Sequence, residues 1–179
     1  MTQQSNRIEV TDPKAYQAKL KQQLAGRNPL DIIAQTPDAL ERLVRGHSAA
    51  AMRARPFAGK WTPNEVLGHL LDTEWTFGYR IRTILCDEEP VIVGMDQERW
   101  VSVQRHNERE PAELLAAFRF LRQQNVALWR RVSPEQMKRI GKHVERGPEP
   151  LELILQLEAG HDLSHIDQLE RYLAAAGGT

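Results

Sequence analysis

Two histidines near the C-terminal end, His161 and His165, are spaced so that a helix would carry both on one face. Ile154, Leu157 and Tyr172 fall on or beside the same stripe, so the imidazoles occupy positions that core side chains normally take. A buried imidazole needs partners for both ring nitrogens, and no carboxylate lies between the two on this stripe. A divalent metal ion can be such a partner, because neutral imidazole is a common ligand of zinc, nickel, iron and copper.

An isolated H-x-x-x-H also fits two surface histidines or two hydrogen-bonded core histidines, so a third ligand is needed to favour metal binding. His69 is the candidate, because it lies on the inward stripe of a helix predicted over residues 62–85. Three neutral imidazoles would leave positions on an ion for water or substrate, which is typical of a catalytic site and not of a closed structural one.

The helix that carries His69 has the firmest start signal in the chain. Thr62, Pro63 and Glu65 combine a hydroxyl N-cap, a proline at the first helical position and a glutamate at the third, which is a capping box. The helix with the histidine pair is predicted from Pro150 and is expected to end by Gly177-Gly178.

The pattern of apolar residues predicts an all-α protein with four main helices. They are expected near residues 36–46, 62–85, 111–132 and 150–176. The first is predicted to start at Thr36-Pro37, and no strand-like alternation of useful length appears. These helices suit a four-helix bundle with antiparallel neighbours and longer crossings, whose interior is where such folds build cofactor sites.

The segments between and before these helices are expected to be less regular. Residues 86–110 are long enough to cross from one end of the bundle to the other, with a short helix near residues 97–105, and residues 142–150 are predicted to form a loop. Residues 1–29 form an extension outside the bundle domain of residues 30–176. Its first 11 residues are polar and expected to be poorly ordered, and an accessory helix follows from Pro13.

Composition limits the classes of protein. A chain of 179 residues suits one domain, and its 24 basic and 24 acidic residues cancel, which gives no reason to expect nucleic acid or an anionic membrane as partner. Cys86 is the only cysteine, so a disulfide-stapled secreted fold is excluded. The start lacks the pattern of a signal peptide and no window has the length of a membrane span, so a cytoplasmic protein is expected.

Two stretches together resemble a known family. G-K-W-T-P-N-E-V-L-G-H-L-L-D-T-E, which contains His69, and H-D-L-S-H-I-D-Q-L, which contains His161 and His165, are similar to the DinB superfamily, the DinB/YfiT-like metalloenzymes. The resemblance covers roughly residues 30–173. It implies up-down-down-up connectivity, a divalent nickel, zinc or iron ion on these three histidines, and a homodimer.

The resemblance leaves the reaction open. Relatives include metal-dependent hydrolases and thiol-dependent S-transferases or isomerases that use mycothiol or bacillithiol, so a small-molecule substrate and a low-molecular-weight thiol cosubstrate are both expected candidates. Two alternatives remain: a non-catalytic, stress-associated bundle that binds a metal or ligand, and a metal-free bundle with polar core histidines.

Other polar residues are candidates for supporting roles. Asp72, Ser164 and Gln168 lie near the histidines and could orient an imidazole or a bound water. Glu158, which flanks the histidine pair, and His143, in the loop before the last helix, are the candidates for a general base. Arg80 and Arg82 could bind a substrate carboxylate, although surface cations on an amphipathic helix fit the same pattern.

Overall fold

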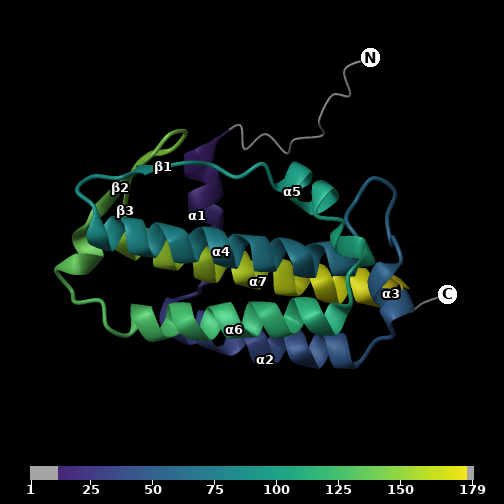
Figure 1. Ribbon diagram of the computed structural model, residues 1–179. Coiled ribbons are helices and arrows are strands. Elements are labelled where there is room, and N and C mark those ends of the chain that lie inside the picture. The colour runs from purple at the N-terminus through teal and green to yellow at the C-terminus, as the bar shows by residue number, and fades with distance from the viewer. Residues whose placement is uncertain (1–11, 177–179) are drawn as a thin grey trace, which may run out of the picture.

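The computed structural model describes residues 12–176, and its four long helices form a bundle (Figure 1). They are α2 (Pro29–Arg45), α4 (Pro63–Cys86), α6 (Pro111–Trp129) and α7 (Leu151–Ala176). Helix α2 runs in one direction, α4 and α6 run in the opposite direction, and α7 returns parallel to α2 (Figure 1). The fold is therefore the expected four-helix bundle with up-down-down-up connectivity.

The shorter elements lie at the ends and along one side of the bundle. Within residues 12–176 they are the helices α1 (Pro13–Gln23), α3 (Ala49–Arg53) and α5 (Gln97–Val103), the 3-10 turns η1 (His106–Glu108) and η2 (Gln136–Lys138), and the strands β1 (Val91–Ile92), β2 (Ile140–His143) and β3 (Gly147–Pro150). Because α4 and α6 are parallel, the segment between them returns along the whole bundle and carries β1 and α5 (Figure 1).

The start of α4 confirms the predicted capping box. The Thr62 hydroxyl accepts a hydrogen bond from the Glu65 N–H at 3.1 Å, and the Glu65 carboxylate accepts one from the Thr62 N–H at 2.7 Å. These bonds satisfy backbone donors that a helix start otherwise leaves open. The apolar residues of the inward stripe that carries His69 are buried, namely Val66, Leu70, Phe77, Ile81 and Ile84.

The predicted start of the first bundle helix was wrong. Helix α2 begins at Pro29, and the side chain of Asn28 caps it by accepting a hydrogen bond from the Leu30 N–H at 2.9 Å. Thr36-Pro37 lies inside the helix, where the Thr36 hydroxyl is 3.1 Å from the Ile32 carbonyl oxygen instead of capping a new start. The Asn-Pro pair carries the same start signal about two turns earlier, and sequence alone did not rank the two.

Residues 142–150, predicted as a loop, contain most of a β-hairpin. Strand β2 pairs antiparallel with β3, and β1 pairs parallel with β2 through Val91 and Lys142. Gly147 takes the left-handed conformation in the turn, with φ of 80°. The strands have two to four residues each, too short to show alternation, and β1 comes from a distant part of the chain. The pairing therefore depends on tertiary contacts.

The interior of the bundle is apolar at both ends and polar in its middle. One apolar cluster includes Ile33, Ile81 and Trp129, and the other includes Leu40, Leu70 and Phe118. Between them lies a buried polar layer formed by Thr36, Glu74, Arg122, Glu158, His161 and Asp162. Every long helix contributes to this layer, and the histidine pair of α7 lies at its level.

Some expectations concern segments outside the described residues. These are the disorder expected for residues 1–11 and the helix end expected at Gly177-Gly178. Among residues 12–176, no helix is both long and apolar enough to cross a membrane.

Candidate metal site

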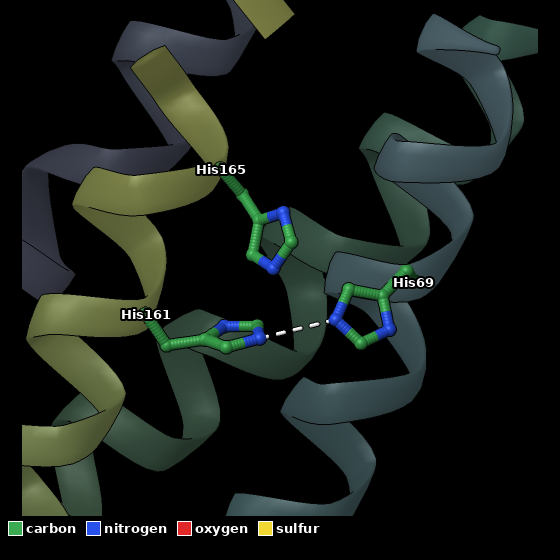
Figure 2. A group of neighbouring side chains, drawn as sticks. All are labelled: His69, His161 and His165. Carbon is green, nitrogen blue, oxygen red and sulfur yellow. Dashed lines mark hydrogen bonds between the residues drawn. The ribbon is translucent and has the colours of Figure 1, made fainter. Parts of the chain in front are cut away.

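Helices α4 and α7 bring three histidines together in the bundle interior. His69 and His161 are buried, and His165 is half-buried. The Nε2 atoms of His69 and His161 are 3.1 Å apart, and the ring centroid of His165 lies 4.7 Å and 4.3 Å from theirs. Figure 2 shows one ring nitrogen of each residue turned toward a common point between the helices.

The electrostatic environment keeps these imidazoles neutral. Burial lowers the pKa of His69 and His161 well below the usual value, and the neighbouring His165 lowers both further. Burial lowers the pKa of His165 to about 4, although Gln168 and Asp162 act in the opposite direction. A neutral imidazole has a free lone pair at neutral pH, and that is the form that binds a metal.

The arrangement fits a divalent metal ion. Nitrogens bound to one zinc ion at about 2.0–2.1 Å in tetrahedral geometry lie about 3.3 Å apart. The Nε2 separation of His69 and His161 is close to this, and one ligand atom from each of the three histidines lies within 4.8 Å of the others. Rotation about the side-chain bonds can bring the three ligand atoms from this 4.8 Å range to the spacing that one ion requires. The buried Nδ1 atoms of His69 and His161 have no hydrogen-bond partner among the described residues.

Gln168 fixes the orientation of the third imidazole. The Nδ1–H of His165 donates to the Oε1 atom of Gln168 at 2.7 Å, so the lone pair is left on Nε2. The other two supporting candidates have different partners. The Ser164 hydroxyl donates to Gln23 and to the Gly160 carbonyl, and Asp72 accepts from His106 at 2.8 Å and from Gln104 at 2.9 Å. Asp72 thus anchors the crossing segment to α4.

Aromatic rings enclose the histidines on two sides. The ring centroids of Trp61 and His69 are 4.8 Å apart, and those of Phe77 and His161 are 6.1 Å apart. The indole N–H of Trp61 donates to Glu98 at 3.1 Å, so the loop before α4 is tied to α5. These contacts limit the access of water to the imidazoles from those sides.

A cavity of about 960 Å³ opens onto the three histidines. Its walls come from α4, α7, the segment of residues 94–98 and, unexpectedly, α1. The side chain of Gln17 on α1 donates to Glu149 at 2.7 Å, and Gln23 accepts from Ser164 at the other end of the helix. The helix predicted as accessory is therefore one wall of the site, which no pattern within residues 13–23 indicated.

The two general-base candidates do not line this cavity. Glu158 is fully buried and accepts from the Trp129 indole at 3.1 Å, and burial raises its pKa well above the usual value, with Glu74 adding to the rise. His143 lies on β2, where burial, with a contribution from Arg146, lowers its pKa to about 4. Both positions give these groups no direct access to a substrate in the cavity.

Arg122 connects the polar layer behind the histidines and was not among the residues predicted from the sequence. Its guanidinium donates to Glu74 at 2.6 Å, to the Ile33 carbonyl at 2.9 Å and to Asp162. The sequence did contain a signal for a buried cation, because Arg122 follows Phe118 by four residues on the same inward stripe. The network contacts α2, α4 and α7 from α6, so it fixes where α7 and its histidines lie.

Most of this chain matches the model of a known protein family. The family model described as the DinB superfamily matches residues 32–169, most of the chain. The chain belongs to the DinB superfamily. The matched DinB region includes all three histidines of the cluster and leaves α1 outside.

Two DinB relatives bear names that refer to a metal. The "Putative metal-dependent hydrolase OB0782" of Oceanobacillus iheyensis is 29% identical over 110 residues, which is 61% of this chain and 63% of that protein. The "Putative metal-dependent hydrolase YfiT" of Bacillus subtilis is 25% identical over 150 residues, 79% of this chain and 82% of that protein.

A solved DinB-like structure has the same fold. It is that of YfiT from Bacillus subtilis, described as "a probable metal-dependent hydrolase with an unusual four-helix bundle topology". The match has a TM-score of 0.74 and 25% identity, and it covers 82% of this chain and 86% of the YfiT chain.

Proposed function

We propose that this protein is a metal-dependent enzyme in which His69, His161 and His165 hold a divalent ion of nickel, zinc or iron. The observation that carries the proposal is the convergence of three neutral imidazoles on one point at the floor of a cavity. An ion held by these three histidines would supply Lewis-acid chemistry, which would lower the pKa of a water or thiol and give a nucleophile near neutral pH. The relatives named as metal-dependent hydrolases favour hydrolysis of a small molecule as the reaction.

The chain's own residues would prepare this reaction by position. Gln168 holds His165 with its Nε2 lone pair toward the other two imidazoles. The rings of Trp61 and Phe77 exclude water from the sides of the site, so that charges inside it are poorly screened. The remaining wall is open to the cavity, where a substrate would reach the nucleophile.

Transfer of a low-molecular-weight thiol is the second candidate. The cavity volume of about 960 Å³ lies near the upper end of the usual range of about 300–1,000 Å³ for ligand sites. That volume suits a substrate together with a thiol cosubstrate better than a single small ester. Homodimer assembly and a cytoplasmic location, also expected from the sequence, stay predictions.

The test begins with metal binding. Chelator-treated protein is titrated with Zn²⁺, Ni²⁺ and Fe²⁺ by calorimetry, and the metal content after reloading is measured by elemental analysis. We expect one ion per chain, and an affinity more than about 100-fold lower in His69→Ala, His161→Ala and His165→Ala. His47→Ala is the control, because that imidazole donates to the Leu43 carbonyl at 2.8 Å and does not line the cavity.

Turnover then separates the reactions. Hydrolysis of p-nitrophenyl acetate that requires both the metal and His165 supports the hydrolase. Metal-dependent loss of thiol with monochlorobimane supports the transferase. Metal-dependent stabilisation without any turnover would favour the non-catalytic bundle. Absence of metal binding would exclude both enzymatic proposals and favour a metal-free bundle.

A further inference from the structure

Arg80 places a positive charge in the wall of the cavity. It lies on α4, further along the helix than His69, and only 7% of its surface is exposed. Its guanidinium carbon is 5.6 Å from the centroid of the Phe77 ring, which in turn lies 6.1 Å from the His161 ring. Arg80 and the histidines therefore line one cavity, with Phe77 between them.

The guanidinium uses little of its hydrogen-bonding capacity. Among residues 12–176, its one hydrogen bond is from Nη2 to the Val93 carbonyl at 3.2 Å, and Nε is buried without a partner. No carboxylate of the described residues forms an ion pair with it. Arg146 on the same wall differs, because Glu149 accepts from its Nε at 2.6 Å and from its Nη2 at 2.9 Å. Arg80 is thus a buried cation of the cavity that forms no ion pair with the described residues.

The charge of Arg80 persists at neutral pH. Burial lowers its pKa to about 10, with a contribution from Arg146, while Glu149 and Glu145 raise it. A buried cation without an ion-pair partner costs free energy, and the negative charge of a bound ligand would offset that cost. Because Glu145 and Glu149 are close enough to affect Arg80, a dianionic phosphate would be repelled more than a monoanionic carboxylate.

We propose that Arg80 binds a carboxylate of the substrate or cosubstrate while another part of that molecule occupies the three-histidine end of the cavity. The planar guanidinium suits a carboxylate in a two-point hydrogen bond. The inference rests on the proposed function, because it takes the histidines as the reactive end. It assigns the ligand to a class of small molecules. These molecules have a carboxylate that is separated from the reacting group by about the width of the Phe77 ring.

The experiment compares dicarboxylates with monocarboxylates of the same chain length. Adipate, suberate and sebacate are titrated by calorimetry into the zinc-loaded protein, and so are hexanoate, octanoate and decanoate. We expect at least one dicarboxylate to bind about tenfold or more tightly than its matched monocarboxylate. This preference should disappear in Arg80→Gln while monocarboxylate affinity stays unchanged. Arg80→Met, whose stem also packs on Phe77, replaces that variant if its thermal midpoint shows that it is not folded.

Arg82→Gln is the matched control, because Arg82 lies on the same helix but donates to the Gly78 carbonyl and to Asn125, away from the cavity. It should keep the wild-type preference. A preference that is absent in the wild type, or equal in Arg80→Gln and the wild type, overturns the carboxylate site and leaves the metal proposal intact. If no metal binds, the proposed function fails. In that case the affinity of metal-free protein for octanoate is measured in the wild type and in Arg80→Gln. Equal affinities in the two proteins overturn the role of Arg80.

Discussion

The hydrogen bond from His165 to Gln168 selects which nitrogen of that imidazole faces its neighbours. We predict that Gln168→Ala lowers the metal affinity roughly 10–100-fold, because the ring loses the acceptor that fixes its tautomer and orientation. Competitive titration against a chromogenic chelator measures the change. Ser164→Ala is the control, since that hydroxyl is bonded to Gln23 and to Gly160 and should leave the affinity unchanged. Equal losses in both variants would contradict the role of Gln168.

The lowered pKa of His165 predicts a pH dependence of stability in chelator-treated protein. Between pH 6.5 and about 4, the unfolded state binds a proton at this imidazole and the folded state does not, so stability falls as pH falls. The slope for one group is at most about 1.4 kcal/mol per pH unit. Urea denaturation at several pH values measures it.

The raised pKa values of Glu74 and Glu158 act in the opposite direction, because the folded state binds their protons first as pH falls. The pH dependence of stability in the wild type is therefore compared with that in His165→Gln, which keeps both carboxyl groups. Stability of the wild type should fall more steeply below pH 6.5 than that of the variant. Parallel plots of stability against pH for the two proteins would show that the His165 imidazole titrates normally in the folded protein.

Helix α1 reaches the site because α7 has a glycine where the two helices touch. A Cβ atom at Gly160 would lie 2.3 Å from the Leu20 carbonyl oxygen, a backbone atom that cannot move aside without moving α1. The close approach brings Tyr16 and Gln17 into the cavity wall. An added methyl group should therefore displace the helix and open that side of the cavity.

We predict that Gly160→Ala destabilises the protein by about 1–3 kcal/mol and speeds amide exchange within α1, although alanine usually stabilises a helix interior. Hydrogen exchange by mass spectrometry, resolved to peptides, measures the local effect. Gly46→Ala is the control, because its nearest neighbouring atoms would be an ordinary 3.7 Å away. Unchanged protection of α1 would contradict the close contact.

The crossing between α4 and α6 is the other element that completes the site. Because the two helices are parallel, this segment must return along the bundle, and Asp72 holds it by accepting from Gln104 and His106. Residues 94–98 then form part of the cavity wall. The connectivity of the bundle thus supplies a wall that a simple up-down-up-down bundle with short loops would lack.

Across the whole molecule, Arg122 joins all four long helices. It is 2% exposed, and its guanidinium on α6 contacts the Ile33 carbonyl on α2, Glu74 on α4 and Asp162 on α7. Removing one member of a buried ionic network leaves the others uncompensated, at a cost of about 3–5 kcal/mol. The histidine pair lies on the same part of α7, so the network also fixes the site.

We predict that Arg122→Met lowers the free energy of unfolding by about 3–5 kcal/mol, measured by urea denaturation. Arg119→Met on the same helix is the control. Its ion pairs with Asp38 and Glu41 are at the surface, so its loss should cost about 1 kcal/mol or less. Equal costs in the two variants would show that the polar layer contributes no more than surface pairs do.

The features that sequence analysis predicted correctly depend on neighbours in the chain. The capping box at Thr62 involves residues three apart, and the pairing of His161 with His165 on one face follows from one helical turn. The start of α2 was predicted wrongly because Asn28-Pro29 and Thr36-Pro37 carry the same local signal. Only the folded structure shows the Thr36 hydroxyl bonded to Asp162, 126 positions away. The hairpin was missed because β2 is completed by Val91, from the crossing segment.

The amino-acid sequence by itself determined the helices, their inward faces and the three histidines as candidates, because helix periodicity and capping are local properties of the chain. Only the folded structure placed the Nε2 atom of His69 3.1 Å from that of His161, which comes 92 positions later in the chain. Only the folded structure placed α1 in the wall of the cavity. It also placed Arg80 in that cavity with no ion pair to any residue in the described range 12–176. These features depend on which helix faces meet, and that is decided by the packing of segments far apart in the chain.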